Sequence, residues 1–149
     1  MELWRISNYA DLSGAGGLHA GGRWHSKGRR IVYLADHPSS ALLETLVHLE
    51  LNMMPANYQL LRIRSEKPIK AEEIEAVDLP TDWFKRIDVT RQIGDRWLDR
   101  ESSALLQVPS ALSPHATNVL LNPEHRDAVL LSVAEIIVAP FDSRLLKAP

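Results

Sequence analysis

Glycine and basic side chains gather near the start of this sequence. Six of the seven glycines fall between positions 14 and 28. Within this stretch and just after it lie Arg23, His25, Lys27, Arg29 and Arg30. Free backbone N–H groups beside positive charges suit phosphate oxygens, although a surface loop with solvated charges would have the same composition. The G-x-x-x-x-G-K-[ST] and G-x-G-x-x-G patterns are both absent, so neither a nucleoside triphosphatase nor an ordinary dinucleotide-binding fold is supported.

A single carboxylate, Glu44, stands out on a predicted helix. Its neighbours are apolar at helical spacing: Leu42, Leu43, Leu46 and Val47. Most glutamates on helices are solvated, but one at the edge of an apolar stripe, after a strand with Tyr33 and a segment with Arg23, can line a pocket. Arginine binds phosphate or ribose oxygens, tyrosine offers a flat face to a heteroaromatic ring, and glutamate stabilises an oxocarbenium-like sugar. These side chains suit a substrate with a ribose, a pyrophosphate and a nicotinamide leaving group, without identifying it uniquely.

Other chemistries receive less support from the residues. The chain has no cysteine, which excludes disulfides, thiol nucleophiles and cysteine-bound metals. Its six histidines lack metal-ligand spacing, so no metal is predicted. The residue types of a serine hydrolase triad are present in Ser110, His125 and Asp127. No G-x-S-x-G elbow surrounds a serine, so serine hydrolase chemistry is a weak alternative.

Length and charge bound the class of protein. With 149 residues, 45% hydrophobic and 24% charged, we expect one globular domain over residues 1–149 with a short C-terminal tail. The net charge of −2 gives no general reason to hold nucleic acid, so direct DNA binding is disfavoured. No signal peptide is visible, and no apolar run approaches the ~18 residues of a membrane span. We therefore expect a cytoplasmic protein without membrane contact.

The elements that must position these side chains alternate between strands and helices. Strands are predicted at 3–6, 31–35, 58–64, 104–108 and 128–138. Helices are predicted at 71–76, at 90–100 despite Gly94, and from a cap at Asp36 toward Pro55, with an apolar stripe that continues to Leu49. Residues 109–123, which hold three prolines, are predicted to be a loop with short turns. The mixed order indicates an α+β fold.

Several segments, taken together, resemble the RES domain family over nearly the whole chain and in order. They are LWRI at 3–6, GGRWHSKG at 21–28, VYLA at 32–35, ALLETLVH at 41–48, VPS at 108–110 and NVLLNPEH at 118–125. The resemblance implies a single domain similar to the ADP-ribosyltransferase toxin fold. It also implies a toxin of a bacterial Xre–RES toxin–antitoxin pair that uses NAD⁺ as its substrate.

The resemblance also implies a set of site residues. The family's active-site Arg, Tyr, Glu and Ser fall on Arg23, Tyr33, Glu44 and Ser110, and Arg5 is an alternative for the Arg. A helix-borne Glu44 differs from the strand-borne glutamate of typical ADP-ribosyltransferases.

Each of these residues has an implied role. Arg23 and Lys27 would face the phosphates, Tyr33 would stack on nicotinamide, and Glu44 would contact the nicotinamide ribose. Ser110 would orient Arg23 or the nucleotide, or act as a turn residue. Asn118 would contact the nucleotide or fix its loop, and fixing or capping roles are equally open for the motif residues Asn122 and His125.

The expected activity is cleavage of the nicotinamide–ribose bond of NAD⁺, with water, phosphate or a protein side chain as acceptor. One alternative is ADP-ribosylation of a metabolic protein. Another is a binding module that holds its antitoxin and senses NAD⁺ without turnover. The partner implied by the resemblance is an Xre-type helix-turn-helix antitoxin that makes the DNA contacts, and a homodimer within that complex is left open.

Overall fold

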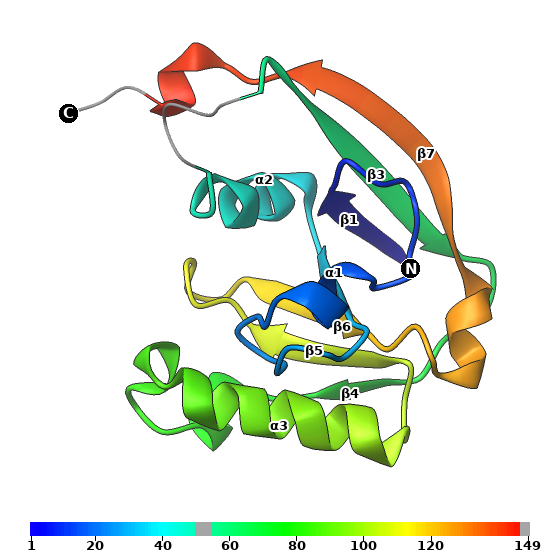
Figure 1. Ribbon diagram of the computed structural model, residues 1–149, viewed down its shortest axis with the longest axis vertical. Helices are drawn as coiled ribbons and strands as arrows, with labels where there is room; N and C mark the ends of the chain where they lie inside the picture. Colours follow the sequence, from blue (N-terminus) through cyan, green and yellow to red (C-terminus); the bar gives the residue numbers. More distant parts are fainter. Residues whose placement is uncertain (50–54, 147–149) are drawn as a thin grey trace.

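One mixed sheet with helices on one face forms the body of the protein (Figure 1). The computed structural model describes residues 1–49 and 55–146. The strands are β1 Glu2–Ile6, β2 Val32–Ala35, β3 Asn57–Ser65, β4 Ala71–Glu73, β5 Leu105–Pro109, β6 Thr117–Leu121 and β7 Leu131–Pro140. The helices are α1 Gly16–His19, α2 Pro38–Leu46 and α3 Ile87–Arg100, with 3₁₀ turns at Ala76–Asp78, Trp83–Lys85, Arg126–Leu130 and Ser143–Leu146.

The sheet has the order β4-β5-β6-β2-β1-β3-β7. Only the β4–β5 pair is parallel among the paired strands of the described residues. Figure 1 shows that β3 and β7 lie at a steep angle to β4 and β5, so the sheet is strongly twisted. The α+β fold predicted from the sequence is confirmed.

The alternation of side chains along the strands separates two faces. On one face, Leu3, Val32 and Leu61 belong to a buried cluster. On the other, α2 places Ala41 against Ala35, and α3 forms a second cluster with neighbouring strands and turns that includes Trp24, Trp83, Trp97, Leu106 and Leu120. Tyr33 packs against this second cluster, so α2, α3 and Tyr33 share one face of the sheet.

The prediction of a helix at residues 71–76 is wrong. Ala71–Glu73 forms β4, parallel to β5, and the 3₁₀ turn Ala76–Asp78 follows. Backbone pairing with β5 outweighs the local helix propensity of this segment. The carboxylate of Glu72 accepts hydrogen bonds from Arg100 (3.1 Å) and from Ser103 Oγ (3.0 Å).

The predicted loop 109–123 contains a central strand. β6 lies between β5 and β2, and Val119, Leu120 and Leu121 are buried. The three prolines of the segment stand outside Thr117–Leu121, so they interrupt the chain without entering the strand. β7 likewise begins later than predicted, because residues 126–130 form a 3₁₀ turn.

Helix α2 is shorter than predicted and buries a different residue. It is capped by His37, whose Nδ1 accepts from the Ser39 N–H (3.1 Å), and not by Asp36. It ends at Leu46, before Leu49, and part of the predicted stretch lies outside the described residues. Ala41 is the buried contact, whereas Leu43 (39%) and Val47 (51%) are exposed. The small Ala41 lets the helix lie close to Ala35.

Helix α3 holds the glycine-rich segment in place. Thr90 Oγ1 donates to the Arg23 carbonyl (2.6 Å), Arg91 Nε to the Gly22 carbonyl (2.7 Å), and Asp95 accepts from Ser26. A Cβ on Gly94 would lie 1.6 Å from the Trp24 carbonyl oxygen. Gly94, which the sequence presents as a weak point of the helix, is therefore the contact point between α3 and this segment.

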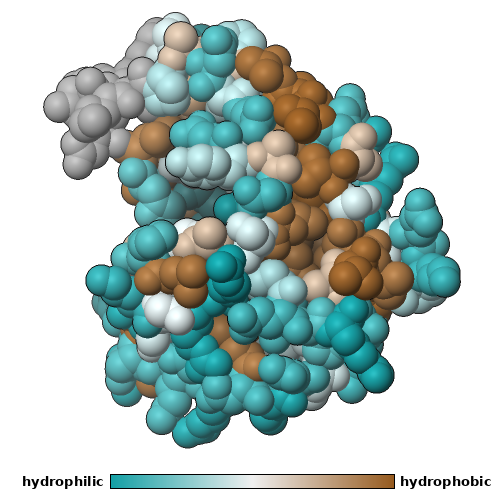
Figure 2. All heavy atoms as spheres, turned by 45° about the vertical axis from the view of Figure 1, so that its right-hand side comes forward, coloured by the Kyte–Doolittle hydropathy of each residue, from teal (hydrophilic) through white to brown (hydrophobic). Residues whose placement is uncertain are grey.

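Strand β7 forms one edge of the sheet and leaves apolar side chains in water. Ile136 (52%) and Val138 (67%) are exposed on it. Figure 2 shows hydrophobic residues gathered along the side of the molecule that carries β3 and β7. Among the helices of the described residues, none has the length and apolar character to cross a bilayer.

Candidate active site

Glu44, Ser110 and Asn118 form one hydrogen-bonded group, although they come from α2, the end of β5 and β6. Glu44 Oε1 accepts from Ser110 Oγ (3.0 Å) and from Asn118 Nδ2 (2.7 Å). Ser110 Oγ in turn accepts the N–H groups of Leu112 (3.1 Å) and Ser113 (3.2 Å), which orients its proton toward the carboxylate. Both donors therefore hold one oxygen of Glu44 in place.

Glu44 borders a small cavity. The cavity has a volume of about 150 Å³ and is lined by Ser39, Ser40, Leu43, Glu44, Ser110, Ser113 and Ala116. Glu44 is half-buried. Within residues 1–49 and 55–146, Oε2 of Glu44 accepts no hydrogen bond from the protein. That oxygen is the one available to a ligand.

Tyr33 is held by a second group of hydrogen bonds. Its hydroxyl lies 2.8 Å from His25 Nδ1 and accepts from the Trp24 N–H (3.0 Å). His25 is buried, and its Nε2 lies 2.9 Å from the Ala20 carbonyl, which can only accept. Nε2 therefore carries the proton, and Tyr33 donates its own proton to Nδ1. Burial lowers the pKa of His25, which favours this neutral ring.

The buried Tyr33 hydroxyl has little acid–base capacity. Burial raises the pKa of Tyr33 to about 12, and the bond from the Trp24 N–H and the charges of Arg91 and Arg23 oppose that shift only in part. A Cβ on Gly22 would lie 2.4 Å from the hydroxyl oxygen, so only glycine fits beside it. The ring face of Tyr33, and not its proton, is the part that can act on a ligand.

Sheet register joins the two groups. Ala35 pairs with Asn118, and Tyr33 pairs with Leu120, in the antiparallel β2–β6 ladder. Tyr33 and Asn118 are therefore diagonal neighbours on the same face, about 7–8 Å apart. The sheet thus places Tyr33 beside the Glu44 carboxylate group.

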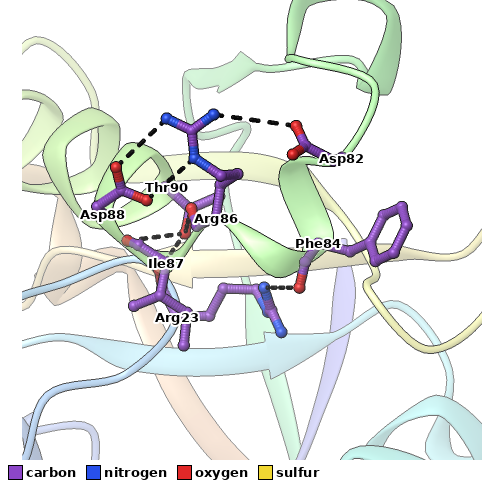
Figure 3. Close-up of polar contacts among 7 residues, drawn as sticks. All are labelled: Arg23, Asp82, Phe84, Arg86, Ile87, Asp88 and Thr90. Carbon is purple, nitrogen blue, oxygen red and sulfur yellow. Dashed lines mark hydrogen bonds and ion pairs between the residues drawn. The ribbon is translucent and has the colours of Figure 1, made fainter.

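Arg23 extends from the Tyr33 group toward the 3₁₀ turn Trp83–Lys85. Its Nη1 donates to the Phe84 carbonyl (3.0 Å; Figure 3). Its guanidinium lies 5.9 Å from the centre of the Trp83 ring. Trp83 therefore packs beside the Arg23 side chain. No sequence motif links Arg23 to Trp83 or Phe84, because they lie some 60 positions away.

Other predicted residues stand apart from this face. Arg5 follows Trp4, which packs toward α2, so Arg5 points to the opposite face and donates to the Asp11 carbonyl (3.0 Å). Burial lowers the pKa of Arg5. Lys27 is exposed and has no hydrogen bond or ion pair within the described part of the chain. Geometry therefore favours Arg23 over Arg5, and nothing ties Lys27 to the Glu44 group.

Ser110 has a different partner from those expected. It contacts Glu44, not Arg23, while also forming the turn after β5. It is not part of a serine triad, since His125 Nδ1 accepts from the Asp127 N–H (3.0 Å) and caps the turn Arg126–Leu130. Asn122 fixes its own loop through the Glu124 N–H (3.0 Å).

A larger hollow lies elsewhere. It has a volume of about 530 Å³ and is lined by residues of both charges, including Lys70, Glu101, Glu124 and Asp127. None of the predicted Arg, Tyr, Glu or Ser site residues lines it. Within the described ranges, no three His, Asp or Glu side chains converge as a metal centre requires.

Comparison with known proteins identifies the family. The model of the RES domain matches residues 2–142. A protein named Toxin Res from Pseudomonas putida is 48% identical over 97% of this chain and 99% of its own length. The Prs ADP-ribosylating toxin of Sphingobium is 36% identical over 98% of this chain and 97% of its own length. The chain therefore belongs to the RES domain family, as the sequence motifs predicted.

A solved structure shares the fold. In the crystal structure of the M. tuberculosis MbcT–MbcA toxin–antitoxin complex, one chain superposes with a TM-score of 0.75 at 18% identity, over 93% of this chain and 84% of that one. The predicted resemblance to a toxin fold is confirmed by this likeness. The relatives named as toxins cover this chain almost end to end.

Proposed function

We propose that this protein is the toxin of a toxin–antitoxin pair and that it cleaves the nicotinamide–ribose bond of NAD⁺. The observation that carries the proposal is the Glu44 carboxylate, fixed by Ser110 and Asn118 on the sheet face that also holds Tyr33 and Arg23. Two relatives support the class, since one is named Toxin Res and another an ADP-ribosylating toxin.

The chemistry needs few groups. When the bond between the anomeric carbon and the pyridinium nitrogen breaks, its electron pair goes to that nitrogen, and nicotinamide leaves as a neutral molecule. No proton has to be delivered to the leaving group, so one carboxylate is enough. The ribose becomes an oxocarbenium-like cation, which Glu44 Oε2 stabilises.

Each remaining residue has a place in this proposal. Tyr33 presents its ring to nicotinamide while His25 holds its hydroxyl. Arg23 pairs with the pyrophosphate, and charge-assisted bonds of this kind are strong and directional. Ser110 and Asn118 position Glu44 and are positioning residues in this scheme. Lys27 remains a proposed phosphate contact on the basis of the motif alone.

The acceptor separates two forms of the reaction. With water the products are ADP-ribose, nicotinamide and a proton. With hydrogen phosphate they are nicotinamide, ADP-ribose phosphorylated at the anomeric carbon, and a proton. A protein side chain as acceptor is the second candidate, favoured by the name of the Sphingobium relative. A shared Glu44 step precedes all three outcomes.

An antitoxin partner is part of the proposal. An enzyme that destroys NAD⁺ in the cytoplasm needs an inhibitor, and the structural neighbour was solved with its antitoxin. We propose an Xre-type helix-turn-helix antitoxin that makes the DNA contacts, because the toxin carries a net charge of −2. A homodimer within the complex stays a prediction.

One assay tests the reaction and its acceptor together. Purified protein is incubated with NAD⁺ labelled in the adenylate half, with and without phosphate and with a cell extract. Release of nicotinamide with labelled ADP-ribose or its phosphate supports the first form, and transfer of label to protein supports the second. Absence of nicotinamide release in every arm would contradict both and favour a binding module.

A further inference from the structure

An exposed aromatic side chain lies beside Arg23. Phe84 is 46% exposed, although its neighbour Trp83 in the same 3₁₀ turn is buried. The centres of the Phe84 and Trp83 rings lie 6.3 Å apart in an edge-to-face arrangement. The backbone carbonyl of Phe84 accepts from Arg23 Nη1 (Figure 3). The turn therefore presents an oriented phenyl ring to water next to the proposed phosphate-binding guanidinium.

Two positive charges border this ring without a carboxylate. Lys85 Nζ lies 5.8 Å from the centre of the Phe84 ring. Neither Arg23 nor Lys85 forms an ion pair with any residue that the structure describes, whereas the adjacent Arg86 is paired with Asp82 and Asp88 (Figure 3). The charges near Phe84 that could attract an anion are thus Arg23, at the Phe84 carbonyl, and Lys85, at the Phe84 ring.

We propose that Phe84 and Lys85 bind the adenylate half of the dinucleotide, with the adenine on the Phe84 ring and the phosphates between Lys85 and Arg23. This inference rests on the proposed function and extends it to the far end of the substrate. Base–aromatic stacking and phosphate–cation contacts are the usual pair of interactions for a nucleotide.

The groups run from the nicotinamide–ribose end of the substrate, shared by Glu44 and Tyr33, toward its adenine end at Phe84. Asn118 holds Glu44, Tyr33 is its diagonal neighbour, and the Trp24 N–H joins Tyr33 to the segment of Arg23. The Arg23 side chain then reaches Phe84. Ribose and nicotinamide at Glu44 and Tyr33, pyrophosphate at Arg23 and adenine at Phe84 follow one another along this path.

Core packing does not account for Phe84. Trp83 already fills the buried cluster beside Trp24, whose ring centre is 6.1 Å away, and Phe84 is not part of that cluster. The Phe84 ring, with Lys85 beside it and Arg23 at its backbone carbonyl, is therefore available to a ligand. A protein contact is the competing use, and the experiment separates it.

Binding is measured calorimetrically with three probes: ADP, adenosine and inorganic pyrophosphate. We expect Phe84→Ala to weaken adenosine and ADP about tenfold, since that is the scale of one base–aromatic stack. Lys85→Ala is expected to weaken ADP and pyrophosphate but to spare adenosine. Phe84→Tyr should retain adenosine binding, and Val129→Ala, at a highly exposed apolar position in another turn, serves as the matched control.

Turnover supplies an independent measure. The ratio of kcat/KM for NAD⁺ to that for nicotinamide mononucleotide, which lacks the adenylate, should fall about tenfold in Phe84→Ala.

Unchanged ADP binding in both Phe84→Ala and Lys85→Ala would overturn the inference, even where NAD⁺ is cleaved. If these variants weaken only the antitoxin, the surface is a protein contact and the inference is wrong. Loss of ADP binding without any NAD⁺ cleavage by the wild type would support this site and refute the proposed function. Should Phe84→Ala fail to fold, the exposed Lys85→Ala decides by its ADP affinity.

Discussion

At the scale of single residues, the site depends on how one carboxylate is held. Ser110 and Asn118 both donate to the same oxygen of Glu44, which leaves the other oxygen for the proposed contact with ribose. The residue types Arg, Tyr, Glu and Ser could be picked out from the sequence, because the motifs carry them. Their partners could not, since the hydrogen bonds join Glu44 to residues 66 and 74 positions away.

Loss of either donor should slow the reaction more than it destabilises the protein. We expect Ser110→Ala and Asn118→Ala each to lower kcat about tenfold, because a hydrogen bond to a charged group is worth about 1.5–3 kcal/mol. The double variant should lose less than the product of the two effects, since both donors serve one oxygen. Steady-state kinetics on the four proteins measures this, and fully multiplicative losses would show that the two donors act separately.

Tyr33 should make stability depend on alkaline pH. Its pKa is raised from 10.0 to about 12, so between these values the unfolded chain loses this proton while the folded chain keeps it. The free energy of unfolding should therefore fall by about 2–3 kcal/mol as pH rises from 10 to 12. Denaturant melts across this range measure the slope, and Tyr33→Phe should reduce it. An equal slope in that variant would assign the effect to other groups.

At the scale of elements, α3 acts as a support for the glycine-rich segment. Three of its residues, Thr90, Arg91 and Asp95, bind the backbone or side chains of residues 22–26. This contact fixes where Arg23 begins and where Trp24 meets Tyr33. The position of the cation therefore depends on a helix that follows it by more than sixty residues.

Gly94→Ala tests this support. In a helix interior the change normally stabilises by about 1 kcal/mol, but here the new Cβ would lie 1.6 Å from the Trp24 carbonyl oxygen. We expect the variant to be less stable than the wild type and to bind NAD⁺ more weakly. Thermal melts and binding titrations check this beside Gln92→Ala, an exposed position on the same helix. A gain in stability from Gly94→Ala would mean that α3 does not press on the segment.

Elements with strong local patterns were predictable, and those set by pairing were not. β1, β2, β3, β5 and α3 follow the apolar spacing of their own residues. β4 was mistaken for a helix because AEEIEA favours one locally, while its partner β5 lies about 34 positions on. β6 could not be recognised in a segment that contains prolines. It is nevertheless an interior strand of the sheet and carries Asn118, on which the Glu44 group depends.

At the scale of the whole molecule, the polar residues of the candidate site lie on one face of the sheet, and we propose that the antitoxin binds the same face. Arg23 has no carboxylate partner within the described residues. A carboxylate of the antitoxin can take the place of the pyrophosphate there, because Arg–carboxylate pairs are directional. Arg29, another candidate from the sequence, is already paired with Asp99.

The partner and NAD⁺ are therefore expected to compete. Titration of the purified complex with an uncleavable NAD⁺ analogue should weaken antitoxin binding in proportion to analogue occupancy. The complex, and not the isolated toxin, should bind operator DNA. Antitoxin affinity that stays constant at saturating analogue would place inhibition at another surface.

The central claim is that the Glu44 carboxylate on this sheet face breaks the nicotinamide–ribose bond. The most direct measurement is nicotinamide release from NAD⁺ by the wild type and by Glu44→Gln, which keeps the shape of the side chain and removes its charge. The account predicts release by the wild type and a loss of about 10²–10³-fold in the variant, with both proteins melting at similar temperatures. Wild-type rates in a folded Glu44→Gln protein, or no release by the wild type, would contradict it.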